Sequence, residues 1–76
     1  MDKIKYSIIS RGELLVKYKE KSIRITGELT FDPPVFYADI ISLQKIKSIN
    51  EDEKKEMIDF ITADSLETIG TKIVFD

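Results

Sequence analysis

The chain has 76 residues, twelve Lys and Arg, fourteen Asp and Glu, a net charge of −2, and neither Cys nor His. This length allows one compact domain over residues 1–76, and the lack of Cys excludes a disulfide framework and fits a reducing compartment. The chain begins without the apolar stretch of a signal peptide, and no apolar stretch is long enough to span a bilayer. We therefore expect a cytoplasmic protein with no membrane partner.

The charges are unevenly distributed along the chain. Residues 1–49 contain nine Lys and Arg against six Asp and Glu, a local charge of +3, whereas residues 50–76 contain three against eight, a local charge of −5. Nucleic-acid-binding domains usually have a basic pI and a basic patch. The pI here is about 5.1 and the basic residues are spread along predicted strands, so nucleic acid is not the expected partner.

Alternation of apolar and polar residues predicts three strands in the first part of the chain, at residues 3–10, 14–19 and 22–31. We expect turns at Arg11-Gly12, where Gly12 supplies a positive φ, and at Glu20-Lys21. Gly27 shares the apolar face of the third strand. A glycine at such a position indicates a β-bulge or the close approach of a ligand, and we favour a bulge that bends the strand around the helix.

The sequence Asp32-Pro33-Pro34 interrupts the strand pattern, because proline lacks an N–H group and restricts the residue before it. Residues 35–37 predict a fourth strand after this interruption. The apolar residues at 40–46 then allow two interpretations. They either continue the fourth strand after a kink at Asp39 or form a fifth, short strand.

Residues 50–69 predict one amphipathic helix. Asn50 is a favourable N-cap residue, Glu53 completes a capping box, and Gly70 suits the position that follows the last turn. At 100° per residue, one sector of this helix is apolar and is expected to face the sheet. This sector contains Met57, Ile58, Ile61 and Ile69.

Residues 71–76 predict a final strand, with Ile73 and Phe75 on one face and Val74 on the other. Together the elements predict an α+β fold: a four- or five-stranded, mainly antiparallel sheet with one helix packed on one face, in the order β-β-β-β-α-β. The expected contact between the two layers joins helix residues Met57, Ile58 and Ile61 to strand residues Ile4, Val16, Ile23 and Ile25.

The residue types that catalysis requires are largely missing. Without His or Cys, the common metal sites and nucleophile–base pairs cannot form, and no glycine-rich loop is present to bind phosphate. Asp52, Glu56 and Asp59 lie along one helix face, where they either hold a hard cation or, as we expect, form a solvated acidic face. The sequence therefore predicts a protein that is not an enzyme, with no catalytic residue, no metal and no cofactor.

The predicted helix offers a candidate surface for a protein partner. Phe60 lies outside the centre of the apolar sector, among carboxylates at helical spacing, and the candidate surface consists of Glu53, Glu56, Asp59, Phe60, Asp64 and Glu67. It suits a basic partner, with Phe60 as an aromatic anchor. Alternatively, the sheet reaches Phe60 and makes it part of the core. Segment 31–37 is a second candidate surface, unless its aromatic residues belong to a turn and to the core.

Most of the chain also carries an ordered set of motifs: SRG at 10–12, IRITGEL at 23–29, VFYADII at 35–41, INEDEK at 49–54 and GTKIVF at 70–75. In this order the chain resembles the immunity protein 74 family of bacterial polymorphic toxin systems. The resemblance implies a cytoplasmic protein that protects its own cell by binding and blocking a cognate toxin. We thus expect a non-catalytic immunity protein with a basic toxin as partner. The alternative is a small structural or regulatory protein-binding module that forms a homo-oligomer through a sheet edge.

Overall fold

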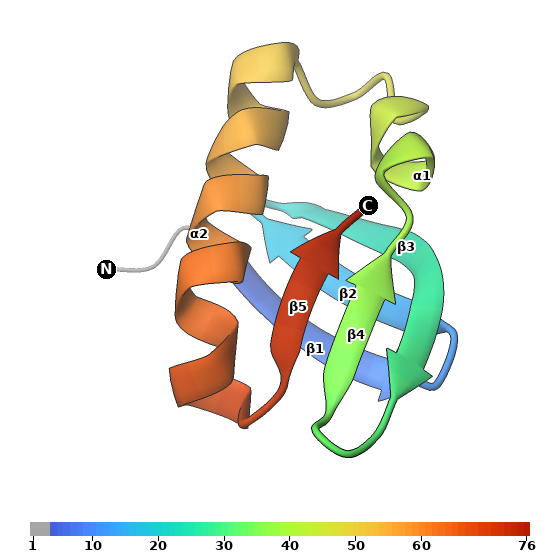
Figure 1. Cartoon of the computed structure of the whole chain (residues 1–76). Helices are drawn as coiled ribbons and strands as arrows, with labels where there is room; N and C mark the ends of the chain where they lie inside the picture. Colours follow the sequence, from blue (N-terminus) through green and yellow to red (C-terminus); the bar gives the residue numbers. More distant parts are fainter. Residues whose placement is uncertain (1–3) are drawn as a thin grey trace.

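The computed structural model describes residues 4–76, which form a five-stranded sheet and two helices (Figure 1). The elements along the chain are β1 (Ile4–Ser10), β2 (Glu13–Tyr18), β3 (Lys21–Thr30), β4 (Val35–Ala38), α1 (Ile40–Gln44), α2 (Glu51–Ile69) and β5 (Lys72–Phe75). The strand order is β1-β2-β3-β4-β5, with antiparallel neighbours except for the parallel pair β4 and β5. The predicted α+β fold with one main helix in the order β-β-β-β-α-β is confirmed.

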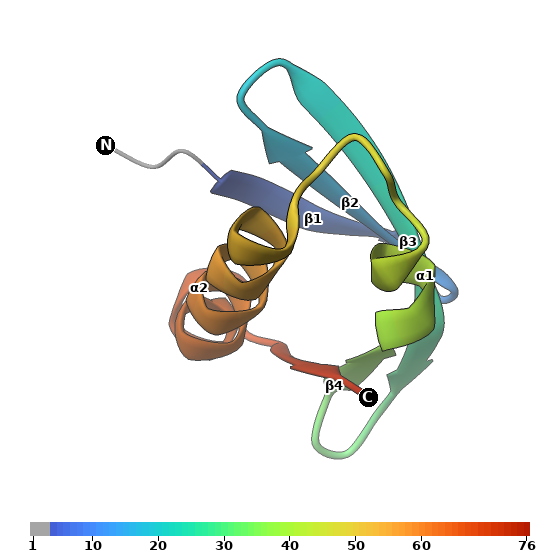
Figure 2. The same cartoon turned by 90° about the horizontal axis from the view of Figure 1, so that it is seen from above.

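The sheet is strongly curved, and its central strand β3 pairs with a different neighbour along each half (Figure 1). The β3 residues up to Thr26 pair with β2, whereas those from Gly27 onward pair with β4. Strands β4 and β5 therefore turn away from β1 and β2, and α2 covers the open side between β1 and β5 (Figure 1, Figure 2). The buried Ser65 Oγ on α2 accepts a 2.9 Å hydrogen bond from the Ile73 N–H on β5. Helix α2 thus satisfies a backbone donor at one edge of the sheet.

Gly27 lies where β3 changes its partner, and it has no space for a side chain. A Cβ atom at this position would lie 2.5 Å from Cε1 of Phe36 and 2.5 Å from the carbonyl oxygen of Tyr37. The pairings of β3 with β2 and with β4 contain no register shift, but the N–H groups of Gly27 and Leu29 donate to the carbonyl oxygens of Gly12 and Arg11, so two β3 steps face one step of the opposite segment here. Glycine is required because the fully buried Phe36 ring packs against the backbone at this point.

The two hairpin turns also differ from the prediction. Gly12 has no positive φ, and the non-glycine residues with positive φ among those described are Lys19 (56°) and Asp32 (67°). The β1–β2 ladder shifts register between Ile8 and Ser10, and this irregularity supplies the twist that a turn without positive φ lacks. The second turn begins at Lys19, one residue earlier than predicted, because Lys19 adopts the left-handed conformation there.

Residues 40–44 form α1, so both strand interpretations of this segment are wrong. The Asp39 side chain caps the helix by accepting a 3.0 Å hydrogen bond from the Ile41 N–H. This cap turns the chain out of β4, and the buried Leu43 then anchors the helix to the core. Isoleucine-rich segments of this length favour a strand by propensity, but the cap and the packing of Leu43 outweigh that preference.

Helix α2 begins and ends as the sequence predicts. The Glu53 N–H donates to Asn50 Oδ1 at 2.8 Å, and the Asn50 N–H donates to Glu53 Oε1 at 3.1 Å, which completes the capping box. Gly70 adopts a left-handed φ of 73°, and its N–H donates to the carbonyl oxygen of Leu66 at 3.2 Å. These local contacts satisfy backbone groups that a helix end otherwise leaves unpaired.

The core lies between the curved sheet and α2. Its buried residues include six predicted ones: Ile4, Val16, Ile23, Ile25, Met57 and Ile61. Ile58 is partly buried and packs against this core. The prediction for Ile69 is wrong, because its side chain is 37 % exposed. The buried sector of α2 runs through Lys54, Met57, Ile61 and Ser65, and Ile69 lies roughly 75° from the centre of this sector.

Lys54 is a charged member of this buried sector, which the sequence pattern does not indicate. Its Nζ donates a 2.9 Å hydrogen bond to the carbonyl oxygen of Gln44 and lies 3.4 Å from Glu51 Oε2. A buried ammonium group requires such partners because its removal from water is costly. The contact fastens the end of α1 to the first turn of α2.

Candidate functional site

The outward face of α2 carries a stripe of carboxylates. Asp52, Glu56, Asp59 and Glu67 are all exposed, and at 100° per residue they fall within a sector of about 80°. Within residues 4–76, none of them forms an ion pair. We call Glu56, Asp59 and Glu67, the three of these that belong to the predicted surface, the acidic stripe.

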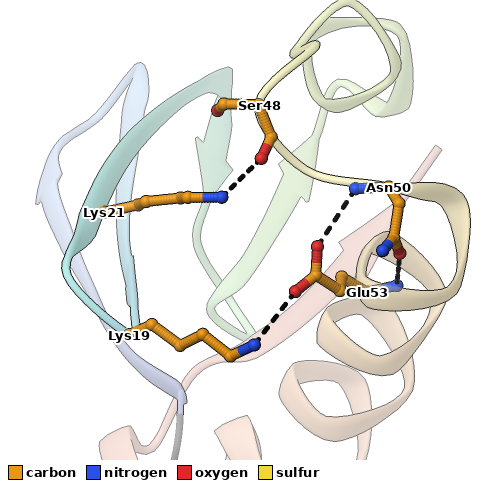
Figure 3. Close-up of polar contacts among 5 residues, drawn as sticks. All are labelled: Lys19, Lys21, Ser48, Asn50 and Glu53. Carbon is orange, nitrogen blue, oxygen red and sulfur yellow. Dashed lines mark hydrogen bonds and ion pairs between the residues drawn. The ribbon is translucent and has the colours of Figure 1, made fainter.

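Glu53 belongs to the predicted surface but is held by the fold. Besides its part in the capping box, its Oε2 lies 3.4 Å from Lys19 Nζ (Figure 3). The hydrogen bond with the Asn50 backbone, and further ones with Tyr18 and Lys19, lower the pKa of the Glu53 carboxyl. Burial raises the pKa of the Tyr18 hydroxyl. Glu53 is therefore a structural carboxylate whose charge is already compensated.

The β2–β3 turn reaches across to the helical layer with two lysines. Lys19 pairs with Glu53 on the first turn of α2, and Lys21 Nζ donates to the carbonyl oxygen of Ser48 in the α1–α2 connection (Figure 3). Both contacts bring positive charge to the start of α2. Among the described residues, the carboxylates of the predicted surface that form no ion pair or hydrogen bond with another element consequently lie further along the helix, at the acidic stripe.

Phe60 and Asp64 are likewise tied to β1, through Tyr6. The Tyr6 and Phe60 rings meet edge to face, with centroids 6.3 Å apart and an interplanar angle of 76°. The Tyr6 hydroxyl donates to the Asp64 carboxylate and lowers its pKa, with a smaller contribution from Thr68. Phe60 is partly buried and packs against the core. This placement corresponds to the second interpretation of Phe60, in which the sheet reaches it.

Leu66 is a large, exposed apolar residue on the outward face, and the predicted surface omits it. Its side chain is 58 % exposed. At 100° per residue it lies opposite the fully buried Met57 and between the directions of Asp59 and Thr62. The same helical wheel therefore contained the signal that identifies Leu66. An exposed leucine beside carboxylates offers an apolar contact that the partly buried Phe60 does not.

The second candidate surface, segment 31–37, is divided between core and solvent. Phe36 is fully buried, whereas Phe31 is 59 % and Tyr37 is 44 % exposed. The guanidinium carbon of Arg11 lies 5.3 Å from the centroid of the Phe31 ring, which positions the two side chains together at the end of the sheet. Only Phe36 matches the interpretation of this segment as a turn with core aromatics.

Metal binding and membrane crossing are two further possibilities for residues 4–76. In this part of the chain no group of three or more His, Cys, Asp or Glu residues is arranged to hold a metal ion. Neither of the two helices combines the length and the apolar character that crossing a membrane requires. Comparison of the whole chain with protein families, curated proteins and solved structures gives no match.

Proposed function

We propose that this chain is a non-catalytic, cytoplasmic immunity protein that binds and neutralises a basic bacterial toxin through the outward face of α2. One observation carries the proposal: Glu56, Asp59 and Glu67 are exposed and form no ion pair within residues 4–76, whereas Glu53 and Asp64 on the same helix are engaged by Lys19 of the β2–β3 turn and Tyr6 of β1. The resemblance to an immunity protein family supplies the biological role.

The charge of the stripe indicates the chemistry of the partner. Toxins that act on nucleic acid tend to be basic, because phosphate contacts dominate their binding. Opposed charges at the rim of an interface mainly accelerate association, whereas a buried apolar contact mainly slows dissociation. We therefore assign the acidic stripe to partner capture and Leu66 to retention.

The proposal is tested first by isolating the partner. The tagged chain is used to retain binding proteins from its native host, and each retained protein is identified by mass. The partner is then purified, and its association rate is measured by stopped-flow fluorescence. For the double variant Glu56→Lys/Asp59→Lys we expect a rate about tenfold lower at low salt, with little difference at high salt.

A matched control carries the same change of charge away from α2. Glu20→Lys/Glu28→Lys alters two exposed carboxylates on the β2–β3 turn and on β3. Because both double variants change the net charge by the same amount, we expect this control to associate clearly faster than the α2 variant at low salt. An acidic partner, or equal rates for the α2 variant and the parent at low salt, would contradict the proposal.

The alternative function, a homo-oligomer formed through a sheet edge, has less support. On the β5 edge the Ile73 N–H is already bound by Ser65 Oγ. On the β1 edge the ladder shifts register between Ile8 and Ser10, and Lys5 projects from the strand. Irregular and charged edges of this kind discourage pairing with another strand.

A further inference from the structure

The outer face of β1 and β2 carries two lysines that oppose each other. Lys5 and Lys17 are direct cross-strand neighbours, and both are exposed. Neither forms an ion pair with any carboxylate of residues 4–76. Like charges at directly opposite positions destabilise a sheet. An anion bound between the two lysines would reduce this repulsion.

A shallow hollow lies between the two lysines. Its volume is about 180 Å³, and its lining consists of Lys5, Tyr6, Ser7, Leu15 and Lys17. The guanidinium group of the nearby Arg24 already forms an ion pair with Glu13 at 3.6 Å, so it contributes less than the two lysines to binding an external anion. The hollow thus offers two ammonium groups beside a partly buried leucine. This arrangement suits a protein surface on which two carboxylates stand next to an apolar side chain.

The chain itself carries such carboxylates, on a different surface. Glu56 and Asp59 lie one turn apart on the outward face of α2 and have no cation partner among the described residues. Helix α2 packs on the inner side of the curved sheet (Figure 2). The hollow opens on the other side, because its residues Lys5, Leu15 and Lys17 alternate along the strands with buried core residues. The two surfaces of one molecule therefore cannot meet, and the complement must come from another molecule.

We propose that a second copy of this chain docks the outward face of its α2 on this hollow, with Glu56 and Asp59 against Lys5 and Lys17. The contact joins two different surfaces, so it is head-to-tail, and the average mass rises with protein concentration. Self-association covers the face that the proposed toxin partner uses. The second copy and the partner consequently compete for the acidic stripe.

The experiment measures mass by sedimentation velocity at about 50 mM and about 500 mM salt, over a range of protein concentrations. For the parent we expect association at low salt that weakens at high salt. Two reversal variants, Lys5→Glu/Lys17→Glu and Glu56→Lys/Asp59→Lys, each make their two surfaces alike in charge. At low salt, the apparent Kd for self-association of each variant alone is expected to be at least about tenfold higher than that of the parent, so each variant stays largely monomeric.

Mixing the two variants restores opposite charges. The first variant keeps the acidic α2 face and the second keeps the basic hollow, so an equimolar mixture is expected to associate again. Lys45→Glu/Lys47→Glu is the matched control, because it makes the same change at exposed positions in the α1–α2 connection. Because this control has the same net charge as Lys5→Glu/Lys17→Glu, it is expected to associate clearly more strongly than that variant at about 50 mM salt.

Three results would overturn the inference: a parent that stays monomeric at low salt and high concentration, reversal variants that associate like the parent, or a mixture that remains monomeric. Circular dichroism tests whether each variant is folded. A reversal that does not fold is replaced by its neutral counterpart, Lys5→Gln/Lys17→Gln for the hollow or Glu56→Gln/Asp59→Asn for α2. A monomeric chain that still binds a basic protein through α2 would refute the self-association alone. A self-associating chain whose α2 variant binds its toxin unchanged would refute only the proposed function.

Discussion

Replacing Gly27 with Ala tests whether the curvature of the sheet depends on contact between β3 and the Phe36 ring. The added Cβ would lie 2.5 Å from Phe36 Cε1 and from the Tyr37 carbonyl oxygen, so neighbouring groups in β4 must move. Overpacking of this kind costs about 1–3 kcal/mol, and alanine recovers about 0.4–1 kcal/mol by restricting the unfolded chain. Because the Tyr37 oxygen is a backbone atom in the β3–β4 ladder, the cost falls at the upper end of that range. We expect a net loss of about 2 kcal/mol in the free energy of unfolding.

The matched control is Gly12→Ala, because it makes the same chemical change where space is available. A Cβ on Gly12 would lie 3.7 Å from the Gly27 carbonyl oxygen, which is an ordinary contact, and its φ is not positive. We expect this variant to be as stable as the parent or more stable by up to about 1 kcal/mol, because alanine restricts the unfolded chain.

Both variants are measured by urea titration followed by circular dichroism. With a slope of about 1–2 kcal/mol per molar urea, a loss of about 2 kcal/mol lowers the midpoint by about 1–2 M. If the midpoints of Gly27→Ala and Gly12→Ala coincide, β3 is not pressed against Phe36 and the reasoning about the curved sheet is refuted.

Three further predictions concern α2. Ile61→Ala should lower the free energy of unfolding by about 2–4 kcal/mol, because the Ile61 side chain is fully buried. Leu66→Ala should change it by less than about 0.5 kcal/mol. Similar losses for the two variants would show that the wrong face of α2 is assigned to the core. Asn50→Ala should cost about 1 kcal/mol in the same urea titration through loss of the cap, and an unchanged midpoint would exclude a capping role. The hydrogen bond from Tyr6 lowers the pKa of Asp64 in the folded state. This hydrogen bond therefore stabilises the fold fully when the pH is above the ordinary pKa of an aspartate, and the stabilisation is lost as the pH falls through the lowered pKa. Tyr6→Phe should therefore be less stable than the parent at neutral pH, with a difference that narrows in acid; a difference independent of pH would contradict this linkage.

The pattern of α2 alone does not predict which of its carboxylates are free to bind a partner. The helical wheel places Glu53, Asp64 and Glu56 among the same polar residues, but contacts distant in the sequence separate their roles. Lys19 lies 34 positions from Glu53, and Tyr6 lies 58 positions from Asp64. Helical periodicity does not show which carboxylates form such long-range contacts. It therefore did not separate Glu53 and Asp64, which the fold engages, from Glu56.

The sequence by itself determined the elements whose causes are local. Asn50, Glu53 and Gly70 define α2 because a cap acts on backbone groups within a few residues. Period-two alternation located β1, β2 and β3 because one face of each strand must be apolar wherever a sheet borders a core. These features predicted the order of the elements and most of the core without knowledge of their partners.

Only the tertiary structure decided the features that depend on packing between distant segments. Segment 40–46 has strand propensity, yet it begins as a helix because the Asp39 cap and the buried Leu43 outweigh that preference. Gly27 is needed because a ring from β4 lies against β3, a contact that no pattern within β3 shows. The parallel pairing of β4 and β5 also requires the whole of α2 to cross between them, so it follows from where that helix docks. In each case the deciding interaction joins residues that become neighbours only when the sheet curves around the core.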